Sequence, residues 1–297
     1  MSDTLANLRR KIDGAVKLES VVRTMKAVAA SSISQYEAAV HALADYERSV
    51  QLGLSVCFRQ GRATTLRSSG GRSEGVTGAI VFGSDQGLVG QFNEAMAEFV
   101  EKTLVTVPGE KKVWAVGERI CGRLTDAGLP LTGQFAVPSS INAITALVGQ
   151  LQMAVEEQGS GCAKIDVFYT KLASGAQYEP VSQRLLPLDA QWQKDLIKIS
   201  WPTKNLPELF GQEEVTLRAF IREYLFITLF KACAESLASE NASRLAAMQR
   251  AEKNIDSLMT ELNRTFYRLR QSSIDEELFD VIAGFNALSS KTSSSGR

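Results

Sequence analysis

The chain has 297 residues, of which 44% are hydrophobic, so it is long enough for one large domain or two small ones with a substantial core. Its 33 basic and 33 acidic residues cancel, which gives no general reason to bind nucleic acid or an anionic membrane surface. No apolar run reaches the ~18 residues that are needed to cross a bilayer.

Residues 1–58 predict one long helix. The segment contains no proline, because all seven prolines lie between Pro108 and Pro207, and proline is the strongest helix breaker. A helix from about residue 3 to residue 57 would be roughly 80 Å long. Its apolar or small residues recur every three or four positions, the heptad period of a left-handed coiled coil. They are Leu8, Ile12, Ala15, Leu18, Val22, Met25, Ala29, Ile33, Tyr36, Val40, Leu43, Tyr46, Val50, Leu54 and Cys57.

The same segment carries a cluster of basic side chains. A solvated helix face accounts for such a cluster, and the attraction of an acidic partner is the functional alternative. The cluster consists of Arg9, Arg10, Lys11, Lys17, Arg23 and Lys26.

The middle of the chain predicts a different architecture. Residues 59–75 are rich in Gly, Ser and Arg and predict a flexible linker, and residues 76–210 predict a Rossmann-like α/β domain. Residues 187–211, with several prolines and two tryptophans, predict a packed connector. Alternating strands and helices are typical of a largely parallel sheet. We expect strands at 77–83, 112–117, 131–136 and 164–172, a further strand at 178–186, and helices at 92–105, 118–127 and 140–157.

A glycine-rich turn, Gly83–Gly90, follows the first expected strand and precedes a helix. Such a turn can let a phosphate approach a helix N-terminus. Its spacing, however, is neither GxGxxG nor GxxxxGK[ST], which favours a structural turn over a nucleotide site. Asp85 and Asn93 are as well suited to capping the turn and the helix as to chemistry.

Residues 211–290 predict a second long helix, on the order of 110 Å, followed by a disordered tail at 291–297. A globular domain of this size is only about 40 Å across, so much of the helix must protrude, and a protruding apolar stripe needs a partner. The N-terminal helix has the matching period, so the two predict an antiparallel coiled coil. The stripe is Leu245, Met248, Ala251, Ile255, Met259, Leu262, Phe266 and Leu269; after a phase slip at 271–273 it resumes at Ile274, Leu278, Val281, Phe285 and Leu288.

Histidine-based acid–base catalysis would have to use a single residue. His41 is the only histidine and lies among helix-forming residues, where a surface or packing role is favoured. The first residues show neither the apolar core of a signal peptide nor an evident transit peptide, so we expect a cytoplasmic location or attachment to a cytoplasmic membrane face through partners. The cysteines form no CxxC pair, which predicts buried thiols and neither a zinc site nor a redox dithiol: Cys57, Cys121, Cys162 and Cys233.

Four stretches, in the right order, resemble the gamma-subunit family of F-type, rotary ATP synthases. Thr24–Ala30 resembles its Met-Lys motif before a run of small apolar residues, and Gly83–Asn93 its Ser-Asp-Arg-Gly-Leu-Cys-Gly turn. Ser239–Met248 is similar to its Glu-x-x-x-Arg-Met stretch, and Arg268–Leu288 to its C-terminal signature. Two shorter stretches, Phe168–Lys171 and Leu185–Pro187, also fit.

The resemblance implies a fold and a function. The fold would be α/β: a long antiparallel coiled coil of the N- and C-terminal helices plus a Rossmann-like α/β domain. The chain would be a central-stalk shaft that catalyses nothing and binds no cofactor or metal. It would contact the alpha and beta subunits of a catalytic ring, the epsilon subunit and a membrane rotor ring of c subunits, with no nucleic acid. It would lie peripherally on the cytoplasmic side of a cell inner membrane and couple ion transport to ATP synthesis.

The resemblance also implies partner-contact residues. Met25 and Lys26 match the shaft's contact with beta, and four residues of the C-terminal helix match polar positions that face the ring: Arg244, Arg270, Gln271 and Glu277. We add Arg9 and Arg10 from the basic cluster as candidate contacts.

The chain departs from the family pattern at several positions. After Ala30, Ser31–Glu37 replaces a basic run, and Gln86 and Val89 replace the usual Arg and Cys. Tyr267 stands where Asn is common, and Asp275 replaces Thr. The departures indicate a divergent branch, with a sodium-coupled branch as one candidate. Two other functions stay open on the residues alone: a Rossmann-type nucleotide-dependent enzyme with helical arms, and a coiled-coil scaffold.

Overall fold

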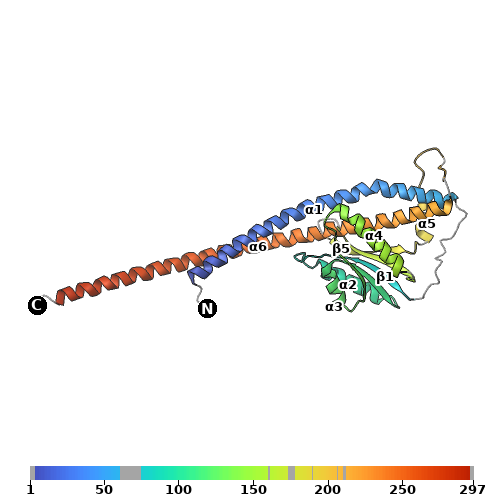
Figure 1. Cartoon of the computed structure of the whole chain (residues 1–297). Coiled ribbons are helices and arrows are strands. Elements are labelled where there is room, and N and C mark those ends of the chain that lie inside the picture. Colours follow the sequence, from blue (N-terminus) through green and yellow to red (C-terminus); the bar gives the residue numbers. More distant parts are fainter. Residues whose placement is uncertain are drawn as a thin grey trace. The chain divides into compact units, whose positions relative to one another are not determined.

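The computed structural model describes residues 4–60, 75–159, 161–172, 178–188, 190–205, 207–209 and 212–294. Internal contacts divide the chain into two units, one formed by residues 28–247 and the other by residues 1–27 together with 248–297. Two long helices, α1 (Leu5–Gln60) and α6 (Glu213–Ser294), contribute to both units (Figure 1). Within the described residues, no helix is long and apolar enough to span a membrane.

The larger unit is built on a five-stranded sheet with the order β3-β2-β1-β4-β5. The first four strands in this order run parallel, and β5 pairs antiparallel with β4, so the sheet is mixed. The expected parallel strands are confirmed to within a residue or two, and β5 is the further strand. Their bounds are β1 (Thr77–Phe82), β2 (Lys111–Val116), β3 (Leu131–Phe135), β4 (Lys164–Leu172) and β5 (Tyr178–Leu186).

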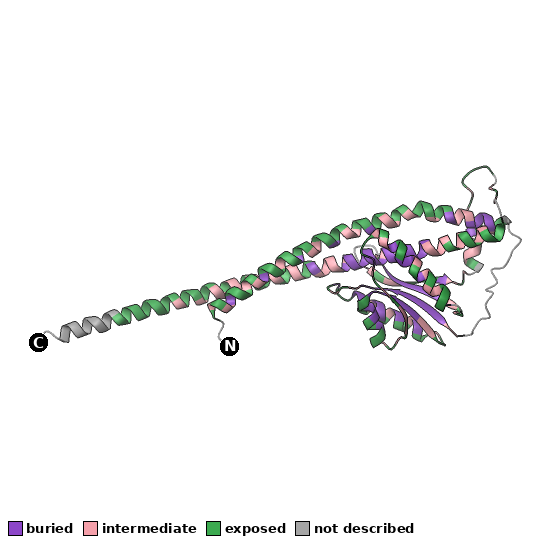
Figure 2. Cartoon of the chain, viewed as in Figure 1, coloured by how far each residue is buried: buried purple, intermediate pink, exposed green. Residues whose placement is uncertain are grey.

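Helices cover both faces of the sheet because the strand side chains alternate between two apolar sets. Ala79 and Val81 of β1 pack toward α2 (Phe92–Val105) and α3 (Glu118–Asp126). Ile80 and Phe82 pack on the other face, toward α4 (Ile141–Gln158) and residues 229–238 of α6. Figure 2 shows the buried strands and the buried stretch of α6 that lies on them. This stretch of α6 is therefore part of the domain core.

In the larger unit, α1 and α6 run antiparallel. The Tyr46 hydroxyl donates to Glu223 at 2.7 Å, and Lys231 lies 3.3 Å from Glu47. The Phe220 ring packs directly against Gly53, where an added Cβ would lie 2.4 Å from the ring. The end of the pair is closed by α5 (Ala190–Ile197), whose Trp192 ring lies 4.9 Å from Tyr224 and 5.8 Å from Phe58.

The smaller unit consists of the first part of α1 and the last part of α6. The buried positions of α1 across the whole helix follow the predicted heptad: Leu8, Ala15, Val22, Ala29, Tyr36, Val50 and Cys57 are all buried. Leu18 and Tyr46 were expected in the stripe but are exposed, since a two-helix seam buries a narrower face than the full apolar list.

The observed ends of some segments differ from the expected ones. The connector at 187–211 contains the short helix α5, because Trp192 and Leu196 anchor it on the apolar end of the helix pair. α1 continues to Gln60, and residues 61–74 of the expected linker lie outside the described residues. α6 continues to Ser294, into the expected tail, because neither glycine nor proline occurs between Gly284 and Gly296; residues 295–297 lie outside the described part.

Candidate functional site

The sheet order places a topological switch point between β1 and β4. The chain moves from β1 outward to β3 in one direction and then returns to β4 on the other side of β1. In open α/β sheets with this arrangement, ligands bind in the crevice at the carboxyl ends of these two strands. Here the carboxyl ends are Phe82 of β1, followed by the Gly83–Gly90 turn, and Leu172 of β4.

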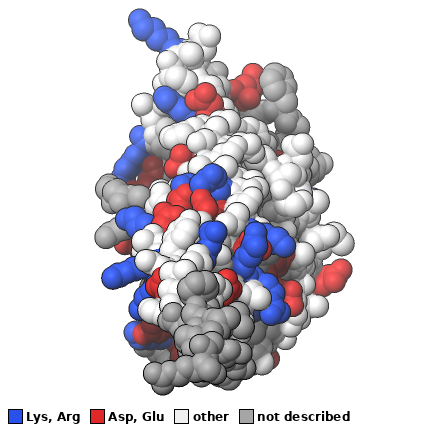
Figure 3. Space-filling view, turned by 90° about the vertical axis from the view of Figure 1, so that its left-hand side faces the viewer, with Lys and Arg blue, Asp and Glu red and all other residues white. Residues whose placement is uncertain are grey.

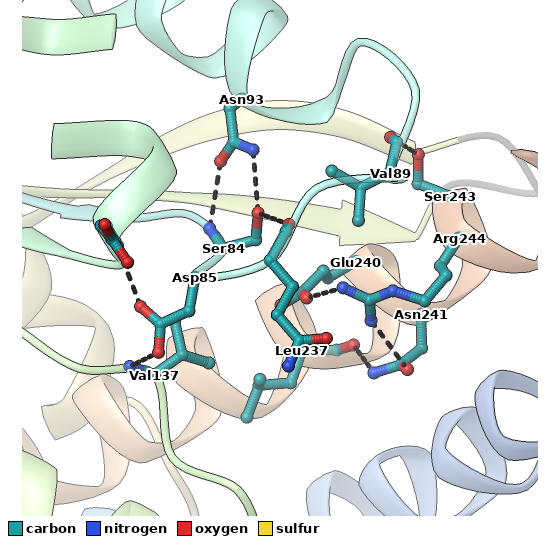
Figure 4. A network of polar contacts seen from close by, with 12 residues as sticks. Ser84, Asp85, Val89, Asn93, Val137, Leu237, Glu240, Asn241, Ser243 and Arg244 are labelled. Carbon is teal, nitrogen blue, oxygen red and sulfur yellow. Dashed lines mark hydrogen bonds and ion pairs between the residues drawn. The ribbon is translucent and has the colours of Figure 1, made fainter. Parts of the chain in front are cut away.

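Helix α6 contacts both sides of this switch point, and Figure 4 shows one of these contacts, between Ser243 and Val89. The Ser239 hydroxyl lies 3.0 Å from the carbonyl oxygen of Thr170 in β4, and 2.8 Å from the carbonyl oxygen of Glu235 in its own helix. One turn later, the Ser243 hydroxyl donates to the carbonyl oxygen of Val89 in the turn after β1. The same Ser243 oxygen lies 2.8 Å from the Tyr178 hydroxyl at the start of β5. Ser239 and Ser243 are almost fully excluded from solvent.

An ion pair lies beside these hydroxyl contacts. Arg244 Nη2 is 2.5 Å from Glu240 Oε1, and the two side chains are only 12% and 7% exposed. Arg244 Nη1 also donates to the Asn241 side-chain oxygen at 3.3 Å, and the Asn241 amide donates to the Leu237 carbonyl at 2.8 Å. Burial raises the pKa of Glu240, and the adjacent Arg244 opposes that rise.

The glycine-rich turn is held by its own polar groups. Asp85 accepts hydrogen bonds from the backbone N–H of Glu118, at the start of α3, and from that of Val137, each at 2.9 Å. Asn93 of α2 reaches back to Ser84, accepting from its N–H at 3.0 Å and donating to its hydroxyl at 2.8 Å. Asp85 and Asn93 therefore have the structural capping role that we considered from the sequence. The Asp85 carboxylate thus lies at the N-terminus of α3, where it complements the positive end of the helix dipole.

Two backbone positions shape this turn. Gly117, just before α3, has φ +118°, and a Cβ there would lie 2.8 Å from the Ser84 carbonyl oxygen. Leu88 has φ 62° although it is not glycine, and its side chain is largely exposed. A left-handed Leu is uncommon and persists only where its surroundings over-determine it. The buried Val89 side chain and the Val89 carbonyl that accepts from Ser243 provide such surroundings.

The smaller unit holds four of the predicted contact residues near the start of α1. Arg9 and Arg10 are exposed, and Met25 is half-buried. Lys26 Nζ is 2.5 Å from Glu252 of α6, and this hydrogen bond lowers the pKa of the Glu252 carboxyl. Lys26 therefore ties the two helices together, and this is a role that the sequence did not reveal.

The last described part of α6 has an apolar face without a partner among the described residues. Arg270, Gln271 and Glu277, the other predicted contacts here, are exposed around it. The phase slip predicted at 271–273 marks its beginning, and Phe279 is 70% exposed. Large exposed apolar patches are typical of interaction sites, so this face is a candidate for one. Its residues are Ile274, Leu278, Phe279, Val281 and Ile282.

Charge is evenly mixed over the face of the molecule shown in Figure 3, where basic and acidic side chains are interspersed among the described residues. This agrees with the formal net charge of +0.

Sequence reasoning missed the inward role of Arg244 and the whole set of contacts made by Ser239 and Ser243. A signal was present: small residues recur on α6 at Ala232, Ser236, Ser239 and Ser243, a spacing that lets a helix approach a sheet closely. The sequence alone did not show whether this face packs on the other long helix or on the sheet.

Three of the four cysteines, Cys57, Cys121 and Cys233, are buried, and Cys162 is half-buried. Burial raises the pKa of all four thiols. Buried, protonated thiols are poor nucleophiles, which agrees with the packing role expected for them. His41 lies at the edge of a cavity of about 370 Å³ that Glu37, Lys171 and Glu235 also line.

Comparisons with known proteins agree on one family. A family model described as ATP synthase matches residues 4–288. The ATP synthase gamma chain of Janthinobacterium sp. (strain Marseille) is 27% identical over 291 residues, covering 95% of this chain and 98% of the relative. The gamma chain of Frankia casuarinae is 28% identical over 310 residues, covering 98% and 100%.

A solved structure shares the fold. It is the central stalk and c-ring structure of the Tetrahymena thermophila mitochondrial ATP synthase, with 23% identity and a TM-score of 0.56, covering 78% of this chain and 99% of that chain. The long terminal helices, the mixed α/β sheet and the match over nearly the whole length agree with one another. The chain belongs to the ATP synthase gamma-chain family.

Proposed function

We propose that this chain is the central-stalk shaft of a rotary F-type ATP synthase, where it couples transmembrane ion flow to ATP synthesis and hydrolysis. The observation that carries this proposal is the family match across residues 4–288, which includes both long helices and the α/β domain between them. The paired helices and the unpartnered apolar face of α6 supply what a shaft needs: a stiff element and a surface for a bearing.

In this role the chain works through unequal contacts. A ring of alpha and beta subunits surrounds the shaft, and each orientation of an asymmetric shaft contacts the three catalytic sites differently. Only such differential contacts can change the nucleotide affinities of the sites in turn. Residues Ile274–Ile282 of α6 reach an apolar bearing in the ring, and Met25, Lys26, Arg9, Arg10, Arg244, Arg270, Gln271 and Glu277 are the candidate contacts to the ring.

Arg244 is less available for contact with the ring than the other candidate residues. Its guanidinium is bound to Glu240 and Asn241 and is only 12% exposed, so a contact with the ring would have to use its remaining exposed edge. Arg270, Gln271 and Glu277 meet no such obstacle, because they are exposed. We therefore rank these three above Arg244 as contacts.

The chain itself catalyses nothing in this proposal. The polar groups of the Gly83–Gly90 turn are used within the fold, and α6 contacts both sides of the switch point, where a Rossmann-type enzyme would hold its nucleotide. The α/β domain sits on the membrane rotor ring of c subunits beside the epsilon subunit. The chain is then a peripheral protein on the cytoplasmic side of the inner membrane.

Purification of the tagged chain from its own cells, under mild conditions, tests the proposal. We expect two larger nucleotide-binding subunits to co-purify with it, in a complex that hydrolyses ATP. Recovery of the chain as a lone, stable homodimer would favour the scaffold alternative. Isothermal titration of the isolated chain with NAD or ATP tests the alternative of a nucleotide-dependent enzyme. We expect no heat of binding from either nucleotide, whereas that enzyme would bind one of them.

A further inference from the structure

We infer that the switch-point crevice of the α/β domain is a socket that holds α6. Ser239, Ser243 and Tyr178 are positioning residues in this socket, and they make the domain rotate together with the helix. The inference rests on the proposed shaft function and deepens it, because it names the residues through which torque passes between the domain and α6.

The place of the contacts is the first support. A Rossmann-like sheet presents backbone groups and a Gly-rich turn at the carboxyl ends of the strands on either side of its switch point, and a ligand usually satisfies them. In this chain, a hydroxyl of α6 approaches the backbone on each side: Ser239 at Thr170 of β4, and Ser243 at Val89 after β1. The two serines are four residues apart, so they lie on one face of the helix.

The chemistry of the contacts is the second support. Both hydroxyls meet backbone carbonyl oxygens, whose positions are set by the strands and the turn and which cannot rotate away as side chains do. Small side chains are required, because the helix axis must come close to the strand ends for a serine to reach them. Tyr178 of β5 adds a third contact, because its hydroxyl lies 2.8 Å from the Ser243 hydroxyl. Its ring centroid lies 6.0 Å from that of Phe92 in α2.

The geometry also resists the relevant motion. A rotation of α6 about its axis within the socket would carry Ser239 and Ser243 sideways, away from Thr170 and Val89 together. It would also take the Glu240–Arg244 pair, which is buried on the neighbouring part of the helix, past the turn that holds Asp85. The left-handed Leu88, next to Val89, is a backbone conformation that persists only where the surrounding structure holds it.

The test uses the whole ATP synthase complex with Ser243→Ala, which removes the hydroxyl from both Val89 and Tyr178 while keeping a small side chain. Tyr178→Phe is the second variant and keeps the aromatic packing on Phe92. Ser257→Ala is the matched control, because the Ser257 hydroxyl lies on the same helix and donates to the Lys253 carbonyl of its own turn.

Two measurements report on the socket directly. Spin labels at Glu101→Cys on α2 and Ala219→Cys on α6, both exposed, report the distance between the domain and the helix in a Cys162→Ser background. We expect a broader distance distribution in Ser243→Ala and Tyr178→Phe than in the control. Hydrogen exchange of the amides in the turn should accelerate on the order of tenfold in Ser243→Ala, because two buried hydrogen bonds are lost.

The functional measurement is the number of ions pumped per ATP hydrolysed. We expect both variants to keep their rate of ATP hydrolysis and to pump fewer ions per ATP, because the apolar core still holds α6 in part, whereas Ser257→Ala keeps both values. Unchanged distance distributions and unchanged pumping in both variants would overturn the socket. If instead the unmodified chain fails to assemble with a nucleotide-binding ring, the proposed function itself is wrong, so the two failures are distinguishable.

Discussion

The Arg244 guanidinium and the Glu240 carboxylate lie against each other where both are almost excluded from water. Removing two charges from water is expensive, and their attraction compensates only when the geometry is good and the remaining donors are satisfied. Asn241 takes one further Arg244 donor, and Leu237 in turn holds Asn241 in place. The pair is therefore sensitive to the loss of either member.

Arg244→Met should destabilise the chain by about 3–5 kcal/mol, because it leaves the Glu240 carboxylate buried without its partner. The double variant Arg244→Met/Glu240→Gln should recover much of this loss, since no uncompensated charge remains. Denaturant unfolding of the single and double variants gives the coupling energy of the pair as a double-mutant cycle. Additive effects of the two changes would contradict this account.

Glu235 is a second carboxyl of α6 in a low-dielectric setting. Burial raises its pKa, Lys171 and Lys231 oppose the rise, Glu47 adds to it, and the Tyr169 hydroxyl hydrogen-bonds to the carboxylate. One carboxylate oxygen is buried without a hydrogen-bond partner. The same burial, with the nearby Glu235 charge, raises the pKa of Tyr169 to about 12.

The raised pKa of Glu235 sets a sign for the pH dependence of stability. The folded chain holds this proton more tightly than the unfolded chain does, so the contribution is fully present below the ordinary value of about 4.3 and is lost as pH rises through the raised value. Glu235→Gln should therefore lose less stability than the unmodified chain when pH is raised from 4 to 8. Thermal unfolding across this range measures the difference.

Glu98→Gln is the control for the pH experiment. Its hydrogen bond from Lys102 lowers the pKa of the Glu98 carboxyl, which is the opposite direction. Glu98→Gln should therefore not show the smaller loss of stability at high pH that we expect of Glu235→Gln. An identical pH profile for Glu235→Gln and the unmodified chain would mean that Glu235 has an ordinary pKa in the folded state.

At the scale of the elements, α1 shows how a heptad is used. Leu8 is 1% exposed, whereas Leu18, which belongs to the same apolar list, is 58% exposed. The two residues have the same side chain in the same helix and in the same unit. They differ in whether that side chain faces α6.

Leu8→Ala should cost about 2 kcal/mol or more of local stability, because it removes buried methyl groups and leaves a cavity. Leu18→Ala should change stability by no more than about 0.5 kcal/mol, since its side chain already contacts water. Hydrogen exchange of the first turns of α1 measures both. Equal exchange rates in the two variants would mean that the helices are not paired at Leu8.

At the scale of the whole molecule, the two helices of the smaller unit matter because a shaft must resist twisting. Ile255 lies in the stripe of α6 and is half-buried in this unit. A proline there removes one helix hydrogen bond and clashes with the preceding turn, at about 3 kcal/mol or more. The position is three residues from Glu252, which bonds to Lys26.

Ile255→Pro should uncouple ATP hydrolysis from ion pumping, because a kinked α6 cannot transmit torque. The measurement is the ratio of ions pumped to ATP hydrolysed in the assembled complex, with Ile255→Ala as the control for loss of the side chain alone. Full coupling in the proline variant would show that this part of α6 carries no torque.

The sequence by itself determined the local features of this protein. Strand alternation, the absence of proline at both ends, the heptad in α1 and the turn residues are all local patterns, so β4, β5 and α2 were predicted with their observed bounds. The start of the exposed apolar face of α6 could also be predicted, since the phase slip at 271–273 directly precedes it. Such periodic patterns can be recognised from residues that are close together in the sequence.

Only the tertiary structure decided which face of α6 packs on which neighbour. Ser239 and Ser243 reach Thr170 and Val89 across 69 and 154 residues of sequence, and Arg244 turns inward to Glu240 instead of outward. Such contacts depend on strand order, which brings β1 and β4 together, and on the rotation of one helix about its axis. Both follow from the packing of the whole core, because many distant apolar surfaces must be buried at once.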